Sequence, residues 1–227
     1  MKIMNIKELL IFSVLGTASV SAQAVPITID FAGMANGAWG ESAWNSLNLS
    51  PLGAGFSVSI TGTYNGNAAY AYLDRNTGGL GVCQELTAAG SAVVNTKTNS
   101  GANLCNPGDD DNMTLGETLR LVFDTNVTIN TLWFNNFHDG DRSLLGDKIN
   151  IGGSPYTFNN GDNNTPSFTL APYTVLAGEI FEIDYNNESF YLDAMNVTAI
   201  TVPEPATLAL LGMGLLGFAG MRRRAEK

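Results

Sequence analysis

Thr118-Leu119-Arg120-Leu121-Val122-Phe123 alternates apolar and more polar positions, with Leu119, Leu121 and Phe123 on one side of the chain. A period of two is that of a β-strand, whose successive side chains point to opposite faces of a sheet. One face of this strand is therefore expected to be buried and the other to meet solvent. The fold prediction starts from this stretch.

The same pattern recurs along residues 25–201. Phe56, Val58 and Ile60 alternate with two serines, and turn residues such as Asn65-Gly66 separate the apolar runs. Further strands are expected at Ile27–Phe31, Ala92–Thr98, Val127–Phe134, Lys148–Ile151, Glu179–Tyr185 and Ser189–Ile200. No helical period is evident in this region, so the pattern predicts an all-β protein with a single jelly-roll-like β-sandwich domain.

The last predicted strand changes the parity of its apolar positions. Phe190 and Leu192 fall on one face, whereas Met195 and Val197 continue the apolar set with the opposite parity. A β-bulge, which inserts one extra residue, restores such a pattern. We expect a bulge near Asp193.

The two cysteines of the chain, Cys83 and Cys105, enclose a loop of 21 residues. In an exported protein such a pair is expected to form a disulfide, which stabilises the fold by about 3 kcal/mol in the loop-entropy model.

The 227-residue chain has a net charge of −10, and residues 25–201 alone hold 5 basic and 18 acidic residues, a net charge of −13. A field of this sign repels nucleic acid and anionic lipid and attracts cations. Nucleic acid is therefore excluded as a partner.

Both ends of the chain are typical of an exported protein. Lys2 and Lys7 precede an apolar run, and Ala22-Gln23-Ala24 fits the small-x-small rule for signal peptidase. Residues 1–24 are therefore predicted to be a signal peptide, which leaves residues 25–201 as the β-sandwich domain and 202–227 as a separate C-terminal segment.

The C-terminal segment begins with Val202, Pro203, Glu204 and Pro205. Proline cannot donate a backbone hydrogen bond, so a helix can begin at Pro205 but cannot continue back through it. Residues 206–221 are uncharged, and at roughly 1.5 Å per residue they reach about 24 Å, just short of a bilayer core. Arg222, Arg223 and Arg224 follow and would hold that end on the cytoplasmic side.

This segment resembles the PEP-CTERM sorting signal of Gram-negative bacteria, in which a Pro-Glu-Pro box precedes a short apolar helix and an arginine cluster. The resemblance implies recognition by an exosortase, a membrane protease that removes the tail, followed by release to the cell surface or the extracellular matrix. It also implies an association with exopolysaccharide and biofilm. A plain membrane anchor, the alternative, does not need the Pro-Glu-Pro box.

A second resemblance covers part of the body. Gly79–Cys83, Gly116–Leu119 and Ser189–Leu192 are similar to segments common among exported PEP-CTERM proteins with sandwich domains. This resemblance implies the fold and does not identify a ligand.

The acidic residues include one candidate metal site. Asp109 and Asp111 lie in a turn that Glu117 follows, and the expected bulge would turn Asp193 inward. Carboxylate oxygens are the ligands that Ca²⁺ prefers, so these four residues are candidates for a structural calcium site. A solvated acidic loop is the alternative.

Two features suggest catalysis. Glu182 and Asp184 share one strand face and resemble the start of the Glu-x-Asp-x-x-Glu strand of some retaining β-glucanases, but Asn187 stands where the second glutamate is required. His138, the one histidine, has no nucleophile motif beside it. We therefore expect a non-catalytic protein, with a secreted polysaccharide hydrolase as the alternative.

Trp39 and Trp44 lie in a stretch rich in Gly and Ser that is expected to be a loop, where indoles can stack on sugar rings, whereas Trp133 is expected in the core. The pairs Thr61/Thr63 and Thr96/Thr98 suggest ice or surface adhesion as a further alternative. The sequence as a whole predicts an exported binding or structural protein with polysaccharide as its partner.

Overall fold

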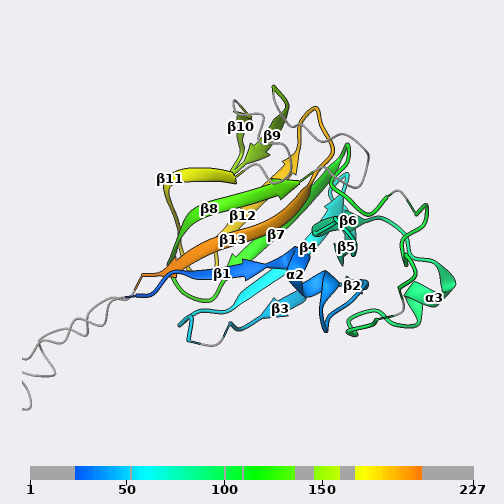
Figure 1. Cartoon of the computed structure of the whole chain (residues 1–227). Coiled ribbons are helices and arrows are strands. Elements are labelled where there is room, and N and C mark those ends of the chain that lie inside the picture. The colour runs from blue at the N-terminus through cyan, green and yellow to red at the C-terminus, as the bar shows by residue number, and fades with distance from the viewer. Residues whose placement is uncertain are drawn as a thin grey trace, which may run out of the picture. The chain divides into compact units, whose positions relative to one another are not determined.

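The computed structural model describes residues 24–51, 53–99, 101–108, 110–135, 146–158 and 167–200 (Figure 1). Residues 24–200 form one compact unit, and the all-β prediction is confirmed. The described strands are β1 (Ile27–Asp30), β2 (Ser42–Trp44), β3 (Leu47–Leu49), β4 (Val58–Tyr64), β5 (Asn67–Leu73), β6 (Leu80–Cys83), β7 (Glu117–Phe123), β8 (Val127–Asn135), β9 (Lys148–Ile151), β10 (Ser154–Thr157), β11 (Ser167–Val175), β12 (Ile180–Tyr185) and β13 (Tyr191–Ala199). The described helices are α2 (Phe31–Asn36) and α3 (Ala88–Ser91).

The strands form one large antiparallel sheet that curls on itself, with the order β10-β9-β12-β7-β4-β5-β6-β13-β8-β11. Three further strands pair outside this order: β1 pairs with β13, β2 pairs with β5, and β3 pairs with β4. The two layers of the predicted sandwich are therefore halves of one sheet. In Figure 1, β8 and β13 run side by side in front of β7 and β12.

The sheet turns its corner at the β4–β5 hairpin. Asn65 and Gly66, at φ values of 48° and 78°, form the tight turn that the sequence predicts. Residues 62–64 of β4 pair with β5, whereas residues 58–60 pair with β3. A Cβ atom on Gly62 would lie 2.7 Å from the carbonyl oxygen of Tyr70, so glycine permits this close approach of two backbones.

The core lies between the two halves of the sheet. As the alternation in β7 predicts, Leu119, Leu121 and Phe123 are fully buried, while residues 118, 120 and 122 face outward and are half-buried. Aromatic rings meet edge to face in this core, with centroid distances of 5.8 Å for Phe56 and Phe123 and 5.5 Å for Phe134 and Phe190. Burial of this apolar surface drives the folding of the sheet.

One predicted strand is wrong. Residues 92–98 form turns after α3, not a strand. The hydroxyl of Thr87 caps α3 by accepting a hydrogen bond from the backbone N–H of Gly90 at 3.0 Å. Asn95 adopts a φ of 61°, and its side-chain oxygen accepts a hydrogen bond from the N–H of Asn45 at 2.7 Å. Local side-chain hydrogen bonds thus replace the expected sheet pairing.

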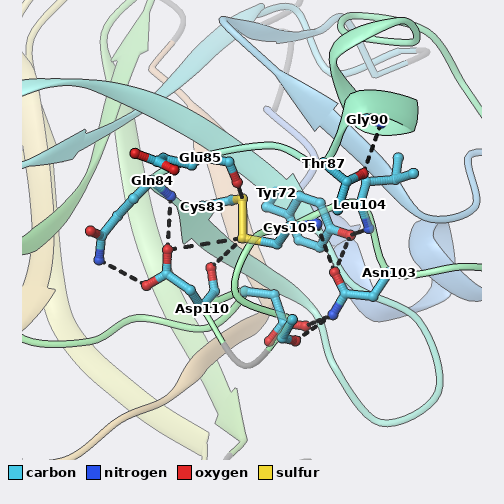
Figure 2. Close-up of a disulfide and its surroundings, with 12 residues drawn as sticks. Tyr72, Cys83, Gln84, Glu85, Thr87, Gly90, Asn103, Leu104, Cys105 and Asp110 are labelled. Atoms are coloured by element: carbon cyan, nitrogen blue, oxygen red, sulfur yellow. Dashed lines mark hydrogen bonds between the residues drawn. A yellow bond between two sulfur atoms is a disulfide. The ribbon is translucent and has the colours of Figure 1, made fainter.

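Cys83 and Cys105 form the predicted disulfide, with a Cα–Cα distance of 5.8 Å (Figure 2). The bond joins the end of β6 to the loop before β7 and lies in a small apolar cluster of its own, which includes Ala43, Tyr72 and Leu104. This cluster is separate from the main core, so the cross-link secures a region that buries little apolar surface of its own.

The predicted signal peptide and the predicted apolar helix 206–221 with its arginine cluster lie outside the described residues. Within the described residues, no helix has the length and apolar character needed to cross a membrane.

Replacing both cysteines by alanine is expected to lower the free energy of unfolding by about 3 kcal/mol, because the unfolded chain regains the entropy of a closed loop. Urea denaturation of the secreted protein measures this change. An unfolding midpoint equal to that of the wild type would contradict a stabilising role for the bond.

Candidate functional site

The candidate site is an open groove of about 590 Å³ between β1, α2 and β3. These elements lie next to one another in the blue and cyan part of Figure 1. The groove is lined by Thr28, Ile29, Asp30, Gly33, Met34, Ala38, Trp39, Asn48, Leu49, Ser50 and Pro51.

Two short edge strands form the sides of the groove. Among the described strands, β1 pairs with β13 and β3 pairs with β4, and neither pairs with a second strand. Asp30 ends β1 and caps α2, since its side-chain Oδ1 accepts a hydrogen bond from the N–H of Gly33 at 2.6 Å. The sequence therefore turns from strand to helix at the groove itself.

Trp39 is the large aromatic side chain of the groove, and its surroundings fix its position. Its ring centroid lies 5.3 Å from that of Trp44, and the ammonium of Lys97 lies 3.8 Å from the same centroid. Its backbone oxygen accepts a hydrogen bond from the N–H of Thr98 at 3.0 Å. Gly40 follows at a φ of 65°, where a Cβ atom would lie 1.9 Å from the oxygen of Thr98. The indole is thus held by the loop that contains Lys97.

Exposed polar side chains line the groove together with the indole. Asn48 donates to the backbone oxygen of Ser46 at 3.2 Å, and the hydroxyls of Ser50 and Ser57 lie 2.9 Å apart. Thr28 adds a further hydroxyl at the β1 side. Of the described residues that line the groove, Asp30 alone carries a carboxylate. The site therefore combines an apolar surface with a few uncharged donors and acceptors.

The sequence anticipates the aromatic part of this groove and misses the rest. Trp39 lies in a loop as predicted, whereas Trp44, whose ring it contacts, lies in β2. Trp133 was predicted in the core, but it is half-buried on the outer face of β8. Thr28, Asn48 and Ser50 belong to no motif, and only the sheet topology brings them to one place.

Three of the four candidate calcium ligands, Asp111, Glu117 and Asp193, lie within the described residues and form no metal-binding cluster there. Asp111 is fully buried and accepts hydrogen bonds of 2.5 Å from the hydroxyl of Tyr191 and from Asn103. Glu117 instead accepts from the backbone N–H and the hydroxyl of Thr114. Among the residues described, no group of three or more His, Cys, Asp or Glu side chains could hold a metal ion.

The other two candidates are Asp109 and Asp193. Asp109 lies outside the described residues. The register of β13 shifts between Leu192 and Ala194, which confirms the bulge, and Asp193 accepts a hydrogen bond from Asn135 at 3.2 Å.

A pair of buried acids, Glu41 and Asp74, lies near the disulfide region. Glu41 accepts a hydrogen bond from the hydroxyl of Tyr72 and another, of 3.0 Å, from the N–H of Arg75. Burial raises the pKa of Glu41 and that of Asp74, and the neighbouring charge of Asp111 raises both further. The protonated form of Asp74 can donate a hydrogen bond to Glu41.

Glu117, which follows the disulfide loop in the sequence, is another buried acid with a raised pKa. Burial raises its pKa to about 8, although the hydrogen bonds that it accepts from Thr114 and Gln84 lower the pKa. The side chain is therefore mainly protonated at neutral pH.

The candidate catalytic pair lies on the outer face of β12. Phe181 and Ile183 face the core. Glu182 and Asp184 alternate with them along the strand and are half-buried. Glu182 forms an ion pair of 2.8 Å with Arg120, and Asp184 accepts a hydrogen bond from Asn150 at 2.6 Å. Both carboxylates thus have partners within the sheet and line no part of the groove described above. His138 lies outside the described residues.

The free energy of unfolding is expected to fall as the pH rises from about 5 to about 8. Glu117 has a folded pKa of about 8, above its unfolded value of about 4.3, so its stabilising contribution is complete below the lower value and lost as the pH rises through the higher one. Denaturation across this range should show a shallower slope in Glu117→Gln, by up to about 1.4 kcal/mol per pH unit.

The exposed Glu85→Gln variant serves as the matched control and should keep the wild-type slope. An unchanged slope in Glu117→Gln would show that this carboxyl is already ionised in the folded protein at neutral pH.

Comparison with protein families identifies residues 201–224 as a PEP-CTERM protein-sorting motif. Neither the curated proteins nor the solved structures yield a match to this chain. The motif confirms the resemblance drawn from Val202–Pro205 and Arg222–Arg224. It implies processing by an exosortase, export and transient anchoring in the membrane through the C-terminus.

Proposed function

We propose that this exosortase-sorted protein binds a neutral polysaccharide, without catalysis, through the groove between β1, α2 and β3. The observation that carries the proposal is the fixed indole of Trp39 in a groove whose other polar groups are nearly all uncharged. Exopolysaccharide at the cell surface or in the extracellular matrix of a Gram-negative bacterium is the partner that the sorting motif favours.

The chemistry of the groove suits a sugar. A pyranose ring offers an apolar face of C–H groups and a rim of hydroxyls, so it needs an aromatic surface together with donors and acceptors. Trp39 and Met34 supply apolar surface, and Asn48, Ser50 and Thr28 supply hydrogen-bonding groups. The ammonium of Lys97 lies against the indole and is exposed, so a sugar can displace it without exposing a buried charge.

The charge of the domain selects among polysaccharides. With a net charge of −13 on residues 25–201, the domain repels uronate-rich or sulfated polymers. The carboxylate of Asp30 adds to this repulsion within the groove. A neutral polymer meets no such barrier.

The absence of catalysis is part of the proposal. Glycoside hydrolysis by the usual mechanisms needs two carboxyl groups on either side of the scissile bond. Asp30 is the one carboxylate among the described lining residues, and Glu182 and Asp184 are engaged with Arg120 and Asn150 elsewhere. Signal peptidase and the exosortase are the enzymes that act on this chain in the proposed route.

Replacing Trp39 by alanine is expected to raise the Kd for a neutral polymer about tenfold or more, since loss of a central aromatic anchor commonly costs more than about 1.4 kcal/mol. Affinity electrophoresis of the secreted protein in gels that contain hydroxyethylcellulose or galactomannan measures this, with alginate as the anionic polymer.

Tyr185→Ala is the matched control, because it removes a half-buried aromatic of β12 that does not line the groove. Equal retardation of Trp39→Ala and the wild type, or preferential binding to alginate, would overturn the proposal.

A further inference from the structure

We propose that the outer face of β8, β13 and β1 is a second binding surface, which docks on the ordered surface of an insoluble neutral polysaccharide. The surface is formed by Thr28, Thr128, Asn130, Thr131, Asn196 and Thr198, which we call the threonine–asparagine face. It goes beyond the groove proposed above, since it provides a broad surface for packed chains rather than a cleft for one chain.

The sheet register aligns these side chains in rows. Thr131 of β8 pairs with Asn196 of β13, which in turn pairs with Thr28 of β1. A second row runs from Thr174 of β11 through Thr128 to Thr198. Neighbouring strands lie about 4.8 Å apart. The two rows are alternate residues on β13, about 6.8 Å apart, whereas on β8 the register shift leaves Asn130 as an extra residue between them. Hydroxyl and amide groups therefore recur in two dimensions, as the hydroxyls of a packed polymer do.

Hydrogen bonds hold the amides of this face in place. Asn130 donates to the side-chain oxygen of Asn196 at 2.9 Å and to the hydroxyl of Thr198 at 2.8 Å. Asn196 donates in turn to the hydroxyl of Thr28 at 2.9 Å. Side chains that are fixed before binding lose less entropy when a ligand is bound. The hydroxyls retain acceptor capacity beyond these bonds.

The face is uncharged, in contrast to the rest of this acidic domain. Among the described outer-face residues in the two rows, none carries a charge, and Asp30 and Asp193 lie beyond their end. The opposite outer face, by comparison, carries Arg120, Glu182 and Asp184. A neutral surface can approach the first face without desolvating a charge, and desolvating a charge is costly.

An aromatic side chain favours a sugar over water as the occupant. Trp133 is half-buried on β8 and pairs in register with Ala194, next to the row that contains Thr131. Its indole offers apolar contact to pyranose rings, which a face for ice does not require. Thr28 also lines the groove, so the two sites adjoin at β1.

The test is a pull-down of the secreted protein with microcrystalline cellulose and with chitin beads as insoluble neutral polymers. Thr128→Lys places a charge in the middle of the face and is expected to lower the bound fraction about tenfold, because the ammonium must be desolvated against the polymer. Thr63→Lys is the matched control, since Thr63 is a half-buried threonine on the outer face of β4, and it should bind as the wild type does.

Different results would overturn the two proposed binding sites. If the face acts as proposed, Trp39→Ala still sediments with the insoluble polymers while it loses retardation in the soluble ones. Equal sedimentation of Thr128→Lys and the wild type would overturn the face, as would failure of the wild type to sediment with either polymer. Inhibition of ice recrystallisation without polymer binding would overturn the polysaccharide assignment. Circular dichroism of each variant confirms that it is folded.

Discussion

The close approach of two backbones at Gly62 is the constraint on which the rest of this fold depends. Because no side chain separates β4 from Tyr70 at that point, the sheet can turn and continue from one layer into the other. The two halves then bury their apolar faces against each other in a single core. Strand β3 occupies the remaining edge of β4, and β1 occupies that of β13. The groove lies between these two short edge strands.

Charge is distributed unevenly in this domain. Among the buried acids, Glu41, Asp74 and Glu117 have pKa values that burial raises, and Glu41 and Glu117 accept hydrogen bonds from neighbouring groups. Outside, the Trp39 groove and the threonine–asparagine face are nearly uncharged. The two surfaces that we propose as binding sites are thus parts of an acidic domain that a neutral polymer can approach without desolvating a charge.

Local sequence patterns predicted the parts of the fold that local physics determines. Alternation identified β7 and the buried face of Leu119, Leu121 and Phe123, and the parity change identified the bulge at Asp193. The strand predicted at residues 92–98 was wrong, because hydrogen bonds of the Thr87 and Asn95 side chains outweigh the β-propensity of this segment. The calcium hypothesis placed Asp111, Glu117 and Asp193 together, but spacing along the chain does not reveal that Tyr191, Thr114 and Asn135 engage them. The groove depends on long-range topology, and so Trp39 alone of its lining residues was anticipated.

The most direct test of this account is hydrogen exchange of the secreted protein, measured by mass spectrometry with and without hydroxyethylcellulose. We predict added protection in residues 28–51, most of all in α2 and the loop that carries Trp39, because a bound chain excludes water from the groove and holds these segments in place. Protection confined to β12, around Glu182 and Asp184, or binding with no change in residues 28–51, would contradict the account.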